Sequence, residues 1–189
     1  MTDRDALMRL LAEHSIRRGK FVLASGKISS IYVDARLTTM SPEGMTLIGP
    51  IALQKIRTTG WNPDSIGGLT LGADPISFAI SYASSISSQP LRAFTVRKET
   101  KSHGTRNLIE GPFIRGDQVV IIEDVITTGK SAIQAIEAVY EADGKVLGVL
   151  ALIDREEGGL EAVQTSGHNV LSILSIREIL EIERNQKSY

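Results

Sequence analysis

Residues 118–131 read QVVIIEDVITTGKS, and the interpretation of the whole chain starts from this stretch. Residues 119–122 are apolar and β-branched, as in an interior strand of a parallel sheet. The apolar spacing of residues 133–140 predicts a helix shortly afterwards. Glu123 and Asp124 therefore stand at the carboxyl edge of the predicted sheet, which is where open α/β sheets bind their ligands.

The turn between this strand and this helix is rich in hydroxyl groups. Unpaired backbone N–H groups at a helix start carry partial positive charge, and together with the hydroxyls of Thr127, Thr128 and Ser131 they suit a phosphate group. The carboxylates of Glu123 and Asp124 suit neighbouring ribose hydroxyls. Acids at strand ends and hydroxyl residues at helix caps are also common for structural reasons, so the acid pair alone leaves both interpretations open.

The complete run is more specific than its parts. It resembles the motif with which type I phosphoribosyltransferases bind 5-phosphoribosyl 1-pyrophosphate (PRPP): apolar residues, two acids, two or three apolar or small residues, then Thr-Thr/Ala/Gly-Gly-x-Ser/Thr. The chain matches each class of position, with Glu in place of the commoner Asp as the first acid. The resemblance implies a PRPP site formed by Glu123, Asp124, Val125, Ile126, Thr127, Thr128, Gly129, Lys130 and Ser131.

Size and composition favour one catalytic domain over residues 1–189, with hood elements at about 1–40 and a core at about 41–189, since 42% of the residues are hydrophobic. The formal net charge of -1 argues against bulk attraction to nucleic acid or to an anionic membrane. No apolar run approaches the roughly 20 residues of a membrane span. The absence of cysteine excludes a disulfide framework and fits a cytoplasmic protein.

The order of predicted elements indicates an α/β fold with a central, mainly parallel sheet flanked by helices. Two short strands near the N-terminus predict a small separate β element, the hood. The predicted strands are 21–23, 31–33, 65–69, 91–97, 118–124, 145–153 and 169–173, and the predicted helices are 3–13, 42–58, 75–86, 130–142, 158–165 and 175–184.

A second glycine-rich turn, GGLTLGADP at residues 67–75, also follows a predicted strand. Glycines allow backbone amides to approach an anion closely, although such turns are common everywhere. In type I enzymes a turn at this place binds pyrophosphate, so the resemblance implies that Leu71 and Gly72 belong to a pyrophosphate loop. Many relatives carry a basic pair here, such as Tyr-Lys. In this chain backbone amides and basic residues elsewhere must meet the pyrophosphate charge.

Residues 97–106, RKETKSHGTR, are strongly basic. A solvated charged loop is the ordinary interpretation, but the segment 98–117 is longer than most connections and so is typical of active-site lids. Its pattern resembles the Arg-Lys-x-x-Lys-x-His-Gly loop of the orotate phosphoribosyltransferase family. The resemblance implies a homodimer in which the 98–111 loop reaches the neighbouring subunit's site, with catalytic roles for Lys101, His103 and Asp124. It also implies further PRPP-binding residues, namely Arg97, Lys98, Lys101 and His103.

Two other segments extend this resemblance, SGKISSIYVD at 25–34 and LIDRE at 152–156. The family transfers the phosphoribosyl group of PRPP to orotate in pyrimidine biosynthesis and uses Mg²⁺. We expect Mg²⁺ to be held mainly through PRPP and water rather than by a dedicated protein site. A guanidinium matches the carboxylate of orotate, which implies Arg155 as the orotate ligand, with Thr127 and Lys27 nearby. An exposed surface arginine is the alternative.

Two alternative functions remain open from the residues alone. A purine or other base phosphoribosyltransferase would share residues 123–131 and differ in its base pocket. A PRPP-sensing regulator would bind without turnover, but such regulators usually add a nucleic-acid surface, and neither the charge nor any helix-turn-helix pattern of this chain indicates one.

Overall fold

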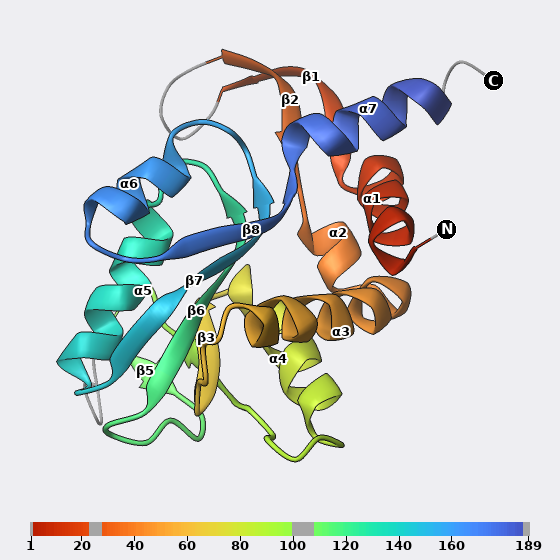
Figure 1. Ribbon diagram of the computed structural model, residues 1–189. Coiled ribbons are helices and arrows are strands. Elements are labelled where there is room, and N and C mark those ends of the chain that lie inside the picture. The colour runs from red at the N-terminus through yellow and green to blue at the C-terminus, as the bar shows by residue number, and fades with distance from the viewer. Residues whose placement is uncertain (1, 23–27, 100–107, 187–189) are drawn as a thin grey trace.

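The computed structural model describes residues 2–22, 28–99 and 108–186. Helices and strands alternate along most of the chain (Figure 1). The helices are α1 (Asp3–His14), α2 (Arg36–Thr39), α3 (Pro42–Thr58), α4 (Ala73–Ser84), α5 (Lys130–Glu141), α6 (Gly159–Thr165) and α7 (Ile176–Gln186). The strands are β1 (Ile16–Val22), β2 (Ile28–Val33), β3 (Ser65–Leu69), β4 (Arg92–Val96), β5 (Ile109–Glu110), β6 (Gln118–Ile126), β7 (Lys145–Asp154) and β8 (Val170–Ser175).

The main sheet has six strands in the order β5-β4-β3-β6-β7-β8. Its strands are parallel except for β5, which pairs antiparallel with β4. Helices cover both faces of this sheet (Figure 1). The predicted α/β fold with a central, mainly parallel sheet is therefore confirmed.

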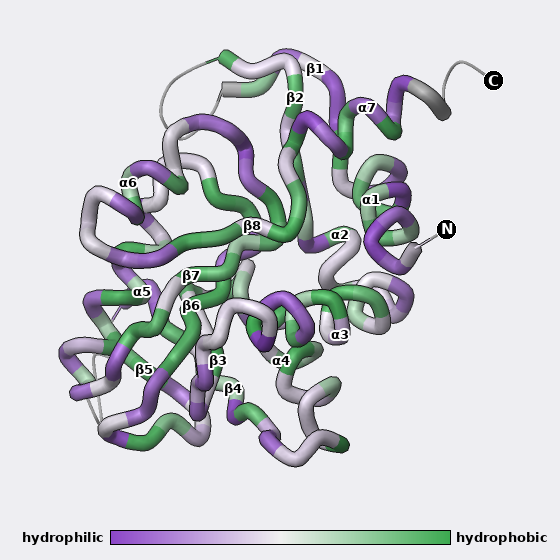
Figure 2. The backbone as a smooth tube through the Cα atoms, in the orientation of Figure 1, coloured by the Kyte–Doolittle hydropathy of each residue, from purple (hydrophilic) through white to green (hydrophobic). Residues whose placement is uncertain are grey.

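Strand β6 is shared by two hydrophobic cores. Val120 and Ile122 pack into the core formed with α1, α3, α4 and α7, whereas Val119 and Ile121 pack into the core formed with α5 and α6. This division follows from the alternation of side chains along a strand, and all four side chains are at most 1% exposed. Figure 2 shows the resulting hydrophobic interior along β6 and β7, with polar residues toward the ends of the outer helices.

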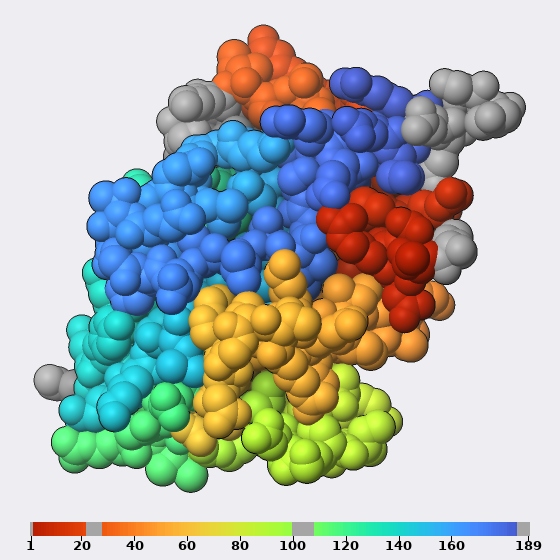
Figure 3. Space-filling model, viewed as in Figure 1, coloured from red at the N-terminus to blue at the C-terminus, as the bar shows by residue number. Residues whose placement is uncertain are grey.

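Sequence signals explain where the main helices begin. Helix α3 starts after Ser41, whose side chain accepts a hydrogen bond from the N–H of Gly44, and Pro42 occupies the first turn. Helix α1 begins with a capping box between Thr2 and Asp5. It lies between α3 and α7 (Figures 1 and 3). None of the helices described is long and apolar enough to cross a membrane.

The N-terminal strands form a separate ribbon, in which β1 pairs antiparallel with β2. The prediction of a strand at 21–23 was wrong in extent, because β1 begins at Ile16. The first part of β1 contains charged residues such as Arg17 and therefore has no apolar pattern that predicts a strand. An exposed two-stranded ribbon needs no such pattern. Arg18 of this ribbon forms an ion pair with Glu183 of α7 at 2.7 Å.

Three smaller differences concern the segments next to the site. The short helix α2, directly after the ribbon, and the two-residue strand β5 were not predicted. Helix α4 was predicted at 75–86 but begins at Ala73 and ends at Ser84. Because α4 starts earlier, the glycine-rich turn after β3 leads directly into its first residue.

Candidate active site

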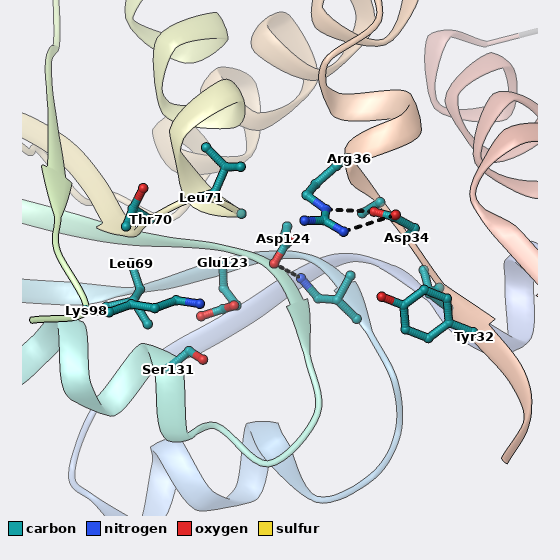
Figure 4. Close-up of a pocket in the computed structure, with 14 residues that line it drawn as sticks. Tyr32, Asp34, Arg36, Leu69, Thr70, Leu71, Lys98, Glu123, Asp124 and Ser131 are labelled. Atoms are coloured by element: carbon teal, nitrogen blue, oxygen red, sulfur yellow. Dashed lines mark hydrogen bonds and ion pairs between the residues drawn. The ribbon is translucent and has the colours of Figure 1, made fainter. Parts of the chain in front are cut away.

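A cavity of about 320 Å³ lies at the carboxyl ends of β3 and β6, the edge at which parallel sheets bind ligands (Figure 4). It is closed on one side by the end of β2 and the start of α2, and on the other by the turn after β3 and the first turn of α5. Its lining residues are Tyr32, Val33, Asp34, Ala35, Arg36, Leu69, Thr70, Leu71, Gly72, Lys98, Glu123, Asp124, Val125 and Ser131.

The acid Asp124 touches the glycine-rich turn of the neighbouring strand. Its Oδ1 accepts a hydrogen bond from the N–H of Val125 at 2.8 Å. A Cβ atom built on Gly72 would lie 2.5 Å from the same oxygen, which is closer than real Cβ atoms come. Glycine at position 72 therefore lets the turn after β3 pack against the acid at the end of β6, and the two motifs meet at one cavity.

Glu123 has an unsatisfied oxygen. Its Oε2 atom is buried and has no hydrogen-bond partner in the described part of the chain. Burial, followed by the negative charge of Asp124, raises the pKa of Glu123 well above its ordinary value. A buried polar atom without a partner is uncommon, so this oxygen is suited to a hydroxyl group of a ligand.

The turn that opens α5 encloses a small hollow of about 20 Å³, lined by Glu123 and by residues 125–131. Gly129 has a φ of 77° and caps the helix, a left-handed conformation that glycine adopts without strain. A Cβ atom at Gly129 would lie 2.9 Å from the carbonyl oxygen of Gly159, so the turn packs closely on the start of α6. The hydroxyls and helix-start amides of this turn form a cradle of the kind that suits a phosphate group.

Arg155 follows β7, and its backbone N–H bonds the carbonyl of Ile126 at 3.0 Å. Its side chain is only 8% exposed, which does not fit an ordinary surface arginine. Nη2 donates to Glu157 Oε1 at 2.9 Å, while the buried Nε has no partner among the described residues. The guanidinium thus keeps a donor that no described residue uses, although Arg155 does not line the cavity of Figure 4.

The basic loop is only partly described. Lys98 lines the cavity and extends toward Glu123 (Figure 4). Arg97 does not line it, because its guanidinium pairs with Glu110 at 3.5 Å and bonds the carbonyl of Glu99 at 3.3 Å. The predicted site residues Lys27, Lys101 and His103 lie outside the described residues.

Sequence reasoning gave no role at the site to Tyr32, Asp34 or Arg36, although the segment 25–34 extended the family resemblance. Asp34 and Arg36 form a two-pronged ion pair, with Nε–Oδ1 at 2.8 Å and Nη2–Oδ2 at 3.1 Å. The hydrogen bonds from Arg36 lower the pKa of Asp34. The available signal was an acid and an arginine two positions apart at the end of a strand, next to Tyr32, which also lines the cavity.

A search of the described residues finds no group of three or more His, Cys, Asp or Glu side chains that could hold a metal ion. Three acids line the cavity, Asp34 at the end of β2 and the adjacent Glu123 and Asp124 of β6, and they do not form such a group.

Comparison with known proteins gives consistent matches. Residues 39–173 match the family model of the phosphoribosyl transferase domain. A protein of Aquifex aeolicus named orotate phosphoribosyltransferase is 43% identical over 183 residues, which cover 95% of this chain and 99% of that protein. A Synechocystis protein of the same name is 40% identical over 97% of this chain and 91% of its own length. The crystal structure of the Mycobacterium tuberculosis orotate phosphoribosyltransferase in complex with PRPP superposes with a TM-score of 0.74, with 35% identity over 94% of this chain and 91% of that one.

Proposed function

The chain belongs to the orotate phosphoribosyltransferase family, and from this membership we propose that it transfers the phosphoribosyl group of PRPP to orotate in pyrimidine biosynthesis. The products are orotidine 5′-monophosphate and pyrophosphate. One observation carries the proposal: the acid pair, the phosphate cradle and the glycine-rich turn after β3 all meet at one edge of the sheet. We treat residues 1–189 as one catalytic domain with the N-terminal ribbon as its hood.

The reaction breaks the bond between the anomeric carbon and a pyrophosphate oxygen and forms a bond from that carbon to a ring nitrogen of orotate. Positive charge develops on the ribose ring while negative charge accumulates on the leaving group, so the site must stabilise both. We assign Asp124 to the ribose and the cradle at 127–131 to the 5′-phosphate. Lys98, with Lys101 and His103 of the same loop, neutralises the pyrophosphate.

The two acids have different hydrogen-bonding capacities. Burial raises the pKa of Glu123 and so favours its protonated form, which can donate one hydrogen bond and accept others, whereas a carboxylate only accepts. Two adjacent ribose hydroxyls each donate and accept. The pair therefore complements a ribose better than two equal carboxylates, which would repel each other at this spacing.

The base is recognised through its charge. Orotate carries a carboxylate, and the partly unpaired, mostly buried guanidinium of Arg155 suits a planar anion. Purine bases carry no such group. Arg155 thereby favours orotate over the purine alternative, with Thr127 and Lys27 as its proposed neighbours at the base.

Mg²⁺ belongs to the proposal as an ion that arrives with PRPP. Mg²⁺ prefers oxygen ligands and keeps several waters, and the acids that line the cavity, Asp34, Glu123 and Asp124, form no metal-holding group among the described residues. When bound, the ion neutralises part of the pyrophosphate charge.

A homodimer is the assembly that we propose, with the 98–111 loop of each subunit serving its neighbour. The exposed apolar side chains after the turn at Leu71 support it: Phe78, Tyr82 and Ile86 recur every four residues and are 48%, 83% and 95% exposed. Mixing Lys101→Ala and Asp124→Asn variants tests the sharing. Activity returns on mixing if one site uses both subunits, and it stays absent if each subunit is self-sufficient. We further propose a cytoplasmic location, with which the lack of cysteine is compatible.

Pyrophosphate release from PRPP, measured with orotate, uracil, adenine and hypoxanthine in turn, tests the proposed reaction. We expect release with orotate alone. Release with a purine instead would assign the chain to another branch of the family. PRPP binding without release, together with RNA or DNA binding that weakens with salt, would indicate a regulator.

A further inference from the structure

We propose that Arg36 binds the pyrophosphate group of PRPP and supplies the positive charge that the turn at Leu69–Gly72 lacks. The inference rests on the proposed function, because it names one more ligand for the same substrate. It assigns a role to a residue that lies outside every motif identified in the sequence.

The position of Arg36 places it opposite that turn. It is the first residue of α2, directly after the ribbon, and it lines the same cavity as Leu71 and Gly72. Figure 4 shows its side chain directed from α2 toward Asp124. The hydrogen bonds to Asp34 raise the pKa of Arg36, and the negative charge of Asp124 adds a smaller contribution.

Asp34 fixes the orientation of the guanidinium. The two-pronged contact uses Nε and Nη2 of Arg36, and Asp34 itself is only 16% exposed. Nη1 has no hydrogen-bond partner among the described residues, and the Arg36 side chain is 46% exposed. An arginine held on one side with donors free on the other is pre-oriented for an anion.

The charges around the cavity show why such a cation is needed. The turn at 69–72 contains no Lys or Arg, and the hydroxyl of Thr70 is bonded to Asp74 Oδ2 at 2.6 Å. Among the described lining residues, the cations are Arg36 and Lys98, against the acids Asp34, Glu123 and Asp124. Backbone amides alone would face a group with several negative charges.

Location also selects pyrophosphate over the other anionic groups of the substrates. The 5′-phosphate has its own cradle at 127–131, lined by residues that do not include Arg36. The carboxylate of orotate has Arg155 at the end of β7, on the other side of β6 from β3. Pyrophosphate is the group assigned to the turn that Arg36 faces.

Calorimetric titration with magnesium pyrophosphate and, separately, with orotidine 5′-monophosphate distinguishes these groups, since the nucleotide has a 5′-phosphate and a carboxylate but no pyrophosphate. Arg36→Gln should weaken pyrophosphate binding about ten- to a hundredfold, the loss typical of one charged hydrogen-bonding group, and leave nucleotide binding unchanged. Arg36→Lys keeps the charge and should lose less. Asp34→Asn keeps Arg36 but frees its orientation, and should fall between wild type and Arg36→Gln.

The matched control is Arg115→Gln, because Arg115 forms a similar pair with Asp143 at 2.8 Å, is 80% exposed and does not line the cavity. It should bind both ligands as the wild type does. Unchanged pyrophosphate binding in Arg36→Gln, or equal weakening for both ligands, overturns the inference. Failure of the wild type to release pyrophosphate with orotate would instead reject the proposed function, which keeps the two outcomes separate.

Discussion

The turns that follow β3 and β6 lie at the same edge of the sheet, yet they are built differently. The turn after β6 carries its own hydroxyls, a left-handed Gly129 and a hollow of about 20 Å³. In the turn after β3 the hydroxyl of Thr70 is hydrogen-bonded to Asp74, and Leu71 is 52% exposed. One turn can hold a phosphate by itself, whereas the other depends on side chains brought to it by other elements.

The roles proposed for the two turns account for this difference. The 5′-phosphate stays on the ribose throughout the reaction, so a local cradle can remain closed around it. The pyrophosphate has to leave, and cations on separate elements such as Arg36 and Lys98 can hold it without enclosing it. The close approach of Gly72 to Asp124 holds the turn after β3 against the end of β6.

Asp124 lies where the two turns meet, and the proposed mechanism uses its negative charge. Asp124→Asn keeps the shape of the side chain but removes its charge beside the developing positive ribose. We expect kcat/KM to fall by about 10²–10³, the size typical for removing one electrostatic contact to a transition state. Pyrophosphate release provides the measurement. A folded variant with unchanged activity would contradict the role of Asp124.

Gly72→Ala breaks the contact between the turns directly. The added methyl group would meet the carboxylate of Asp124, so either the turn or the acid has to move. A displacement of about 1 Å can cost roughly 10²-fold in rate, and we expect a loss of that order in kcat/KM. Gly19→Ala is the control, because a Cβ there meets only the side chain of Phe21. If both variants behave alike, the close packing at Gly72 has no catalytic importance.

Arg155→Ala tests whether orotate and PRPP are bound by different residues. Orotate binding should weaken about ten- to a hundredfold through loss of one charged hydrogen-bonding group, while PRPP binding is kept. Calorimetry with each substrate measures both. The neighbouring Arg177→Ala, which removes an exposed pair with Glu156, should change neither. Equal weakening of orotate and PRPP in Arg155→Ala would point to misfolding.

Glu123→Gln has the smallest expected effect, and it concerns stability. The pKa of Glu123 is raised in the folded protein above its ordinary value of 4.5, so the folded state holds a proton that the unfolded chain has released at the same pH. Stability of the wild type therefore falls as pH rises from 4.5 through the folded pKa.

A glutamine at position 123 carries no charge and avoids this loss. Its melting temperature should exceed that of the wild type at neutral and higher pH, and the difference should vanish as the pH falls toward 4.5. A gain of about 1 kcal/mol corresponds to roughly 2–4 °C in a protein of this size. Melting curves without ligand at several pH values measure it. A difference that grows toward acid pH would mean that the pKa of Glu123 is not raised.

The sequence alone predicted the parts of the site whose residues are contiguous in the chain. Residues 123–131 are adjacent along the chain, and a buried strand followed by a helix places them at one edge without long-range information. It was insufficient for Arg36, because the approach of α2 to β6 depends on how the ribbon packs. Arg97 and Lys98 show a related limit, because the pattern treats them alike. In the structure Lys98 lines the cavity, whereas Arg97 pairs with Glu110.

The division of β6 between two cores bears on how this protein tolerates change. Val119 and Ile121 tie the strand to one half of the molecule, and Val120 and Ile122 tie it to the other. The acid pair lies on this same strand, between these four side chains and Val125 and Ile126, which also pack into the two cores. A cavity opened deep in either half can therefore disturb the chemistry through this one strand, at a distance from every substrate atom.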